Sequence, residues 1–170
     1  MSSLKYLNLN CCSVTKPHPV WEANMTNPHA VTRATVQAHL LVMRYPLTGY
    51  RVAGKKMSPL CPLCQQEPET IDHFLLRCDA LRPFRTENLQ EILSVTRFLR
   101  VDLTTLTSII VDPTSIKTPP DLTASLARST RNLCYRLHIG RKRSAEAGAN
   151  PRHSTSNTPK TTATPAGAAI

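Results

Sequence analysis

Apolar residues recur at helical spacing in the stretch Ala30–Arg44. They lie three, four and three residues apart, at Val31, Ala34, Ala38 and Leu41. This spacing gives a helix one apolar face that packs against the rest of a protein. We therefore expect an amphipathic helix here. Turns should follow it, where Pro46, Gly49 and Gly54 interrupt the pattern.

Three further helices are expected in the second half of the chain. One covers Asn88–Leu99, and the preceding Arg82-Pro83 marks a bend or a helix start. Asp102 can cap a short helix through Ile110, and a Pro-containing loop from Asp112 to Pro120 follows. Asp121 opens the last helix, with apolar residues in register at Leu122, Leu126, Leu133 and Leu137.

The alternation of apolar and polar residues that is typical of β-strands is weak throughout. A small hairpin around Tyr50–Leu60 is the only sheet that the pattern allows. From Gly140 onward the sequence is rich in Ser, Thr, Pro and Ala and almost lacks large apolar side chains. Such a segment buries too little to offset the entropy of ordering, so residues 140–170 are expected to form a disordered basic tail.

Length and composition indicate one modest core. The chain has 170 residues, of which 41% are hydrophobic, and this favours a single domain. No segment approaches eighteen consecutive apolar residues, and the first twenty residues lack the pattern of a secretory signal. We therefore expect an intracellular protein without a membrane partner.

Three of the six cysteines lie within eighteen residues, with one histidine between them: Cys61, Cys64, His73 and Cys78. In a reducing compartment such spacing favours metal binding over disulfides. A Cys-Pro-Leu-Cys turn brings two thiolates onto one ion, and three sulfur ligands with one imidazole suit tetrahedral zinc. Four protein ligands leave no open position for catalysis. A metal-free buried cluster and a redox pair remain as alternatives.

The second half of this motif sets a geometric condition. Thr70 can cap a helix that contains His73 and Cys78. Five residues apart, these two side chains would point about 140° away from each other on an ideal α-helix. The helix must therefore loosen or end near Arg77 if both are to reach one metal. Two other features, Cys134 with His138 and the pair Cys11-Cys12, are expected to be ordinary core or surface residues rather than a second site.

Charge is unevenly distributed along the chain. Lys and Arg minus Asp and Glu give +6 for residues 1–60, −3 for residues 61–112 and +7 for residues 113–170, which sum to the net +10. The basic ends can meet a polyanion. The candidate contacts with RNA or DNA lie on and after the last helix, at Arg128, Arg131, Arg136, Arg141, Lys142 and Arg143. A solvated helix face or a nuclear-import patch is the alternative for the same residues.

The motif and its surroundings resemble a known family. The run YPLTGYRVAGKKMSPLCPLCQQEPETIDHFLLRCDALRPFR, preceded by HAVTRATVQAHLLVMR and followed by RNLCYRLH, is similar to the region after the polymerase core of non-LTR (LINE-like) retrotransposon reverse transcriptases. The resemblance covers roughly Leu4 to Arg143, and it implies a zinc-binding region that helps engage template RNA or target DNA. It also places Cys61, Cys64, His73 and Cys78 at the metal-ligand positions.

The chain also departs from that family. Its five aspartates are never adjacent, so the paired carboxylates that a polymerase uses to hold two metal ions are absent. We therefore expect a stand-alone retroelement-derived module and not an enzyme. The expected organisation is an irregular segment over residues 1–28, a helical zinc-binding domain over 29–139 and the tail. A zinc-stabilised structural or protein-interaction domain, with no nucleic-acid role, is the alternative.

Overall fold

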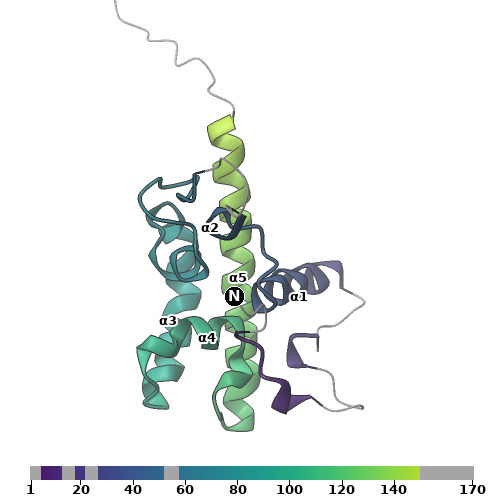
Figure 1. Cartoon of the computed structure of the whole chain (residues 1–170). Coiled ribbons are helices and arrows are strands. Elements are labelled where there is room, and N and C mark those ends of the chain that lie inside the picture. Colours follow the sequence, from purple (N-terminus) through teal and green to yellow (C-terminus); the bar gives the residue numbers. More distant parts are fainter. Residues whose placement is uncertain (1–4, 13–17, 22–26, 52–57, 150–170) are drawn as a thin grey trace, which may run out of the picture.

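The computed structural model describes residues 5–12, 18–21, 27–51 and 58–149, and its regular elements are helices (Figure 1). The α-helices are α1 (Pro28–Leu41), α2 (Thr48–Arg51), α3 (Arg82–Phe98), α4 (Leu106–Val111) and α5 (Pro120–Ala149). Short 3-10 turns are η1 (Leu9–Cys11), η2 (Pro19–Trp21), η4 (Asp79–Leu81), η5 (Leu103–Thr105) and η6 (Pro113–Ser115), and η3 (His73–Arg77) is π-helical. Within the described ranges, extended pairing is limited to one antiparallel bridge between Leu60 and Pro68. The prediction of a mainly α-helical domain is confirmed.

Helix α5 forms the axis of the domain. It packs against α1, α3 and α4, and it stands between α3 and α1 in Figure 1. Its apolar stripe includes Leu126, Leu133 and Leu137, as the leucine spacing predicted. These leucines belong to one core cluster with residues of the other helices that are fully buried, among them Leu40, Ile92, Ile109 and Ile110. The core therefore lies where the helices meet along α5.

The helix boundaries follow local signals that were partly visible in the sequence. Helix α1 begins at Pro28 because the Asn27 side chain accepts hydrogen bonds from the next free amides, with His29 N at 2.9 Å. It ends at Leu41, three residues before the predicted end, and Met43 follows with a positive φ of 54°. Pro83 lies in the first turn of α3, so Arg82-Pro83 is a helix start rather than a bend.

The prediction of a tail beginning at Gly140 is wrong for residues 140–146, because α5, whose last residue is Ala149, continues through them without a break. Gly140 is buried, and a Cβ atom there would come within 2.5 Å of the Phe84 ring of α3. Only glycine permits this close approach of two helices. Residues 150–170 of the predicted tail lie outside the described residues.

The described parts of the N-terminal segment, residues 5–12 and 18–21, contain two short turns and pack onto the core through Tyr6 and Val20. The predicted hairpin around Tyr50–Leu60 falls largely on residues 52–57, which lie outside the described residues, and Tyr50 belongs to α2. Among the described residues, no helix combines the length and apolar character needed to cross a membrane.

Candidate metal centre

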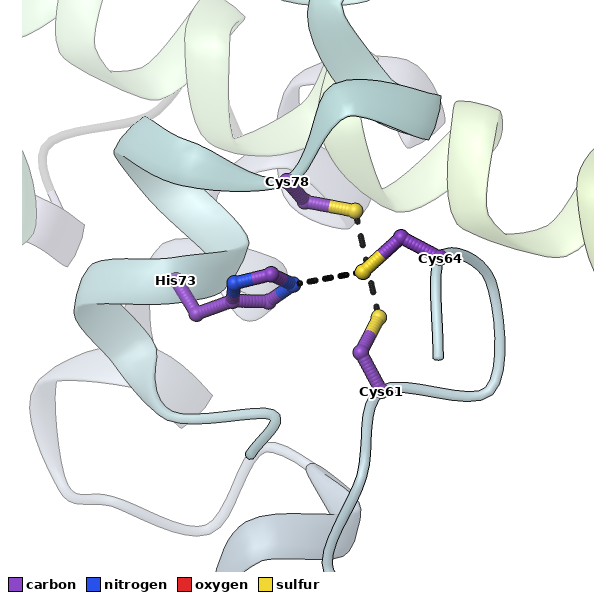
Figure 2. Close-up of side chains that lie close together, drawn as sticks. All are labelled: Cys61, Cys64, His73 and Cys78. Carbon is purple, nitrogen blue, oxygen red and sulfur yellow. Dashed lines mark hydrogen bonds between the residues drawn. The ribbon is translucent and has the colours of Figure 1, made fainter. Parts of the chain in front are cut away.

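Four side chains converge on one point between the loop 58–70 and the turn η3. The ligand atoms of Cys61, Cys64, His73 and Cys78 all lie within 4.8 Å of one another. The Cys61 and Cys78 sulfurs are 3.8 Å apart, and Cys64 Sγ is 3.3 Å from His73 Nε2. Figure 2 shows the four side chains pointing toward one another. The motif therefore forms one cluster, as the spacing predicted.

The geometry of this cluster fits zinc. Tetrahedral zinc with Zn–S bonds near 2.3 Å separates two sulfur ligands by about 3.8 Å. The observed Cys61–Cys78 separation is 3.8 Å. Disulfide sulfurs, by contrast, lie about 2.05 Å apart, and all three cysteines are free. The arrangement therefore suits a four-ligand metal site. Three thiolates and an imidazole would hold the ion and leave no coordination position open for water or a substrate.

The first two ligands come from a tight loop. Cys61 N donates to Glu67 O at 2.8 Å, and Gln65 N donates to Cys61 O at 2.8 Å. These bonds fold the chain back between the bridged residues Leu60 and Pro68. The turn requires a positive φ of 56° at Gln65, a region that glycine adopts at much lower cost. The loop thus brings Cys61 and Cys64 to the same side.

The other two ligands come from a helical turn that is wider than an α-helix. Thr70 Oγ1 accepts from His73 N at 3.2 Å, so Thr70 caps this turn as predicted. Cys78 N donates to His73 O at 2.8 Å, a bond that spans five residues instead of four. Residues five apart then lie one turn apart and close to the same face. The π-helical turn therefore meets the condition that His73 and Cys78 reach one ion.

Two of the three thiols, Cys61 and Cys78, would resist ionisation without a nearby cation. Burial raises the pKa of Cys78 to about 12, and the charge of Cys61 adds to this effect. Burial also raises the pKa of Cys61. Burial acts in the same direction on Cys64, but hydrogen bonds from the Gln66 and Glu67 amides and from the other two thiols together outweigh it and lower the pKa of that thiol. A bound divalent cation supplies the positive charge that stabilises three adjacent thiolates.

Two charged side chains surround the ligands. Glu67 Oε2 lies 3.3 Å from His73 Nδ1 and 3.3 Å from Arg77 Nε. This carboxylate can accept a hydrogen bond from Nδ1–H of His73, which leaves Nε2 unprotonated and free to bind a metal. Arg85, only 6% exposed, donates to Cys78 O at 2.9 Å. Its charge offsets the net −1 that three thiolates and a divalent ion would carry.

A buried ion pair connects the metal-binding segment to α5. The Glu69 carboxylate, 1% exposed, accepts from Arg141 Nε at 2.7 Å and from Arg141 Nη2 at 3.0 Å. It also accepts from Thr48 N at 2.7 Å. Bidentate pairs of this kind fix both distance and orientation. A Cβ atom at Gly49 would lie 2.7 Å from Glu69 O, so α2 can approach this segment only with glycine there.

Sequence reasoning missed these supporting residues. The acidic residues of 61–112 entered the sequence analysis only through the net charge of −3, and Arg141 was placed in a tail. A local signal was available for Glu67, which lies six residues before His73. Metal-bound histidines commonly donate a hydrogen bond to a nearby carboxylate. The partner of Glu69 lies 72 residues away, and local pattern does not reveal it.

The other cysteine and histidine candidates do not form a second site in the described part of the chain. The buried Cys134 thiol faces Ile110 O, and His138 Nδ1 lies 2.8 Å from the Tyr45 hydroxyl. Burial lowers the pKa of His138, with Lys142 and Arg141 adding to the effect. Cys11 and Cys12 are partly buried, with sulfurs 3.9 Å apart. Cys134 and His138 are thus a core and a rim residue.

The six basic residues that were predicted to contact nucleic acid fall into two groups. Three have protein partners: Arg131 donates to Pro19 O, Arg136 pairs with Glu87, and Arg141 pairs with Glu69. The other three, Arg128, Lys142 and Arg143, are exposed on α5. Any contact with a polyanion therefore begins with this second group.

Comparison with models of known protein families, with curated proteins and with solved structures found no match to this chain.

Proposed function

We propose that this chain is a zinc-binding helical module of retroelement origin that contacts RNA or DNA with little sequence preference. The convergence of four ligand atoms within 4.8 Å carries the first part of the proposal. Because all four positions of a tetrahedral ion are filled by protein, the zinc has a structural role. It holds the loop 58–70 and the turn η3 in place against α5.

Charge supports the second part of the proposal. The chain carries +10, and residues 113–170 contribute +7 of it. Arg128, Lys142 and Arg143 project from α5 without a carboxylate within ion-pair distance among the described residues. Exposed basic side chains on a rigid helix attract a phosphate backbone at any sequence. The resemblance to the region after retrotransposon polymerases favours the same partner.

An enzymatic role is not part of this proposal. A catalytic zinc keeps a coordination position open, and this cluster fills all four. His18 is also a poor general base, because Nδ1 accepts from Val20 N at 3.2 Å while Nε2 faces Asp112 at 3.3 Å. We therefore expect the chain to act by binding.

One observation favours the alternative, a zinc-stabilised domain with a protein partner. Phe98 at the end of α3 is 74% exposed, and it borders a groove of about 410 Å³ with Val95, Pro119 and Leu122. Exposed aromatic residues of this kind occur at protein interfaces. An affinity that does not change with salt would support this alternative.

Binding of oligonucleotides at several salt concentrations tests the proposal. For the zinc-loaded protein, the logarithm of the affinity should fall linearly with the logarithm of the salt concentration. Replacing Lys142 and Arg143 with Gln should flatten this slope without changing the circular dichroism spectrum, because both side chains are exposed. Replacing Lys117, which is also exposed but lies before α5, is the matched control. The absence of any salt-dependent binding by the folded protein would overturn the nucleic-acid role.

A further inference from the structure

Helices α1, α3 and α5 enclose a small polar pocket that shares no residue with the metal centre. Its volume is about 270 Å³, and it is lined by Arg33 of α1, Glu87 and Asn88 of α3, and Asn132, Tyr135 and Arg136 of α5. This volume lies just below the range of pockets that hold drug-sized molecules. The pocket therefore suits a flat polar group of the size of a nucleobase.

The Arg33 guanidinium is held in the pocket without a counter-charge. Its centre lies 5.5 Å from the centroid of the Tyr135 ring, and Nη1 donates to Asn132 Oδ1 at 3.2 Å. Its Nε atom is buried and lacks a hydrogen-bond partner. Among the described residues, no carboxylate lies within ion-pair distance of Arg33. The guanidinium plane is thus fixed in orientation, and it retains unused hydrogen-bonding capacity.

A second polar side chain in the pocket also lacks a protein partner. Asn88 is only 9% exposed, and its side chain makes no hydrogen bond to another described residue. Because the buried unpartnered side-chain atoms of the described residues are all arginine Nε atoms, the Asn88 amide reaches the open side of the pocket, where a ligand can bind it. Asn132 uses its carbonyl for Arg33, and its NH2 group is left for a ligand. Two amides therefore line the pocket with free donors or acceptors.

The mixture of donors and acceptors indicates which ligand fits. A phosphate group offers acceptors only, so it could pair with Arg33 but would give the amide oxygen of Asn88 no donor. The edge of a nucleobase offers donors and acceptors together, which asparagine amides recognise. Unpaired bases also stack on arginine planes that are held by aromatic rings. The lining therefore matches a base better than a free anion.

We propose that this pocket takes the base of one unpaired nucleotide, stacked on Arg33 and hydrogen-bonded by Asn88 and Asn132. This inference rests on the proposed function and gives it a preference for single strands. Helical periodicity places Arg128 and Arg143 within about 40° of Asn132 around α5. These exposed residues lie on either side of the pocket along the helix and would contact the phosphates that flank the bound nucleotide.

Fluorescence anisotropy with ten-nucleotide homopolymers of A, C and U and a ten-base-pair duplex tests the pocket. Single strands should bind more tightly than the duplex at equal salt. Arg33→Lys keeps the charge but removes the planar guanidinium, so it should weaken single-strand binding about tenfold with an unchanged salt slope. Arg97→Lys, the same change at an exposed residue in the last turn of α3 and outside the pocket, should alter the affinity less than twofold. Circular dichroism and zinc content verify that both variants fold.

A second measurement needs no variant. Mononucleotides added to the zinc-loaded protein should shift the NMR signals of the Asn88 and Asn132 side-chain amides. Any one of three results would overturn the assignment of a base to this pocket and leave the proposed function intact. They are wild-type affinity in Arg33→Lys, equal binding of the duplex and the single strands, and unshifted amide signals at millimolar mononucleotide. Failure of the wild-type protein to bind any of the nucleic acids would contradict the proposed function itself.

Discussion

In the described part of the chain, cysteine and histidine lie close together in the metal centre and in a cluster near the N-terminus, and the first of these could hold a metal ion. In the metal centre, His73 Nε2 points at the Cys64 sulfur from 3.3 Å. In the N-terminal cluster, which comprises Cys11, Cys12, His18 and Asp112, both ring nitrogens of His18 have protein partners, Val20 N and the Asp112 carboxylate. The Thr114 hydroxyl donates to the Cys11 sulfur at 3.5 Å.

The comparison indicates that ligand-type residues are available to a metal ion only where their lone pairs are left unused and converge on one point. In the N-terminal cluster the polar groups satisfy one another, so the fold there needs no ion. In the metal centre the thiols face one another with few alternative partners, and burial raises the pKa of Cys61 and Cys78. A bound cation would stabilise the deprotonated thiols and make their close approach favourable. Variants in the two regions should therefore have different consequences.

The largest effect is expected for Cys78→Ala. Removing one of four ligands should abolish tight zinc binding, whose apparent free energy, on the order of 10 kcal/mol, rivals the total stability of a small domain. Cys12→Ala should leave zinc content unchanged, because Cys12 belongs to the other cluster. Zinc content and the dispersion of amide signals from residues 58–84 measure both variants. Full zinc content in Cys78→Ala would remove this distinction between the clusters.

A large loss of stability with zinc retained is expected for Asp112→Ala. Asp112 is fully buried, and its carboxylate accepts from Asn8 N at 2.9 Å and from Thr114 N at 2.9 Å, as well as facing His18. Its removal leaves several buried donors without an acceptor and should cost about 3–5 kcal/mol. Urea denaturation gives the cost. A variant that lost zinc before it unfolded would show that the two regions are coupled more directly than their contacts indicate.

An intermediate effect is expected where the metal centre meets α5. Glu69→Gln keeps the shape of the buried side chain but leaves Arg141 without its carboxylate, and should destabilise by about 2–3 kcal/mol. Glu87→Gln breaks the pair with Arg136, which is largely exposed, and should cost less than about 0.5 kcal/mol. The two thermal midpoints provide the comparison. Equal midpoints would mean that the Glu69–Arg141 pair does not anchor the helix.

The smallest effect concerns the loop that carries the first two ligands. Gln65 has a φ of 56°, so Gln65→Gly should relieve backbone strain and stabilise the zinc-loaded protein by about 1 kcal/mol. The neighbouring Gln66 has no such φ, and Gln66→Gly should destabilise slightly through added freedom in the unfolded chain. Denaturation of the two variants compares them. The same sign of change in both would contradict the strain at Gln65.

The sequence predicted that Cys61, Cys64, His73 and Cys78 would lie together, because their clustering depends on local spacing. A Cys-x-x-C loop and a capped turn each need only nearby residues, and the π-helical turn was required by the five-residue interval between His73 and Cys78. Helix α1 was placed within three residues of its observed ends for the same reason. Elements governed by periodicity and caps are therefore predictable from the chain alone.

The extension of α5 was not predictable in this way. A glycine often marks the end of a helix, and the residues that follow Gly140 are mostly polar or small. Two long-range contacts hold this part of the helix, the packing of Gly140 on Phe84 and the ion pair of Arg141 with Glu69. Both partners, Phe84 and Glu69, lie more than fifty residues away in sequence. Composition therefore placed Arg141 in a tail, although it pairs with a residue next to the metal centre.

We propose that one zinc ion, held by Cys61, Cys64, His73 and Cys78, orders the segment 58–81. Zinc titration of the metal-stripped full chain, followed by ¹⁵N–¹H correlation spectra, tests it most directly. We expect poorly dispersed signals for this segment without zinc, and native-like signals that saturate at one equivalent of zinc per chain. Complete dispersion before zinc is added, with no further change on titration, would contradict the claim.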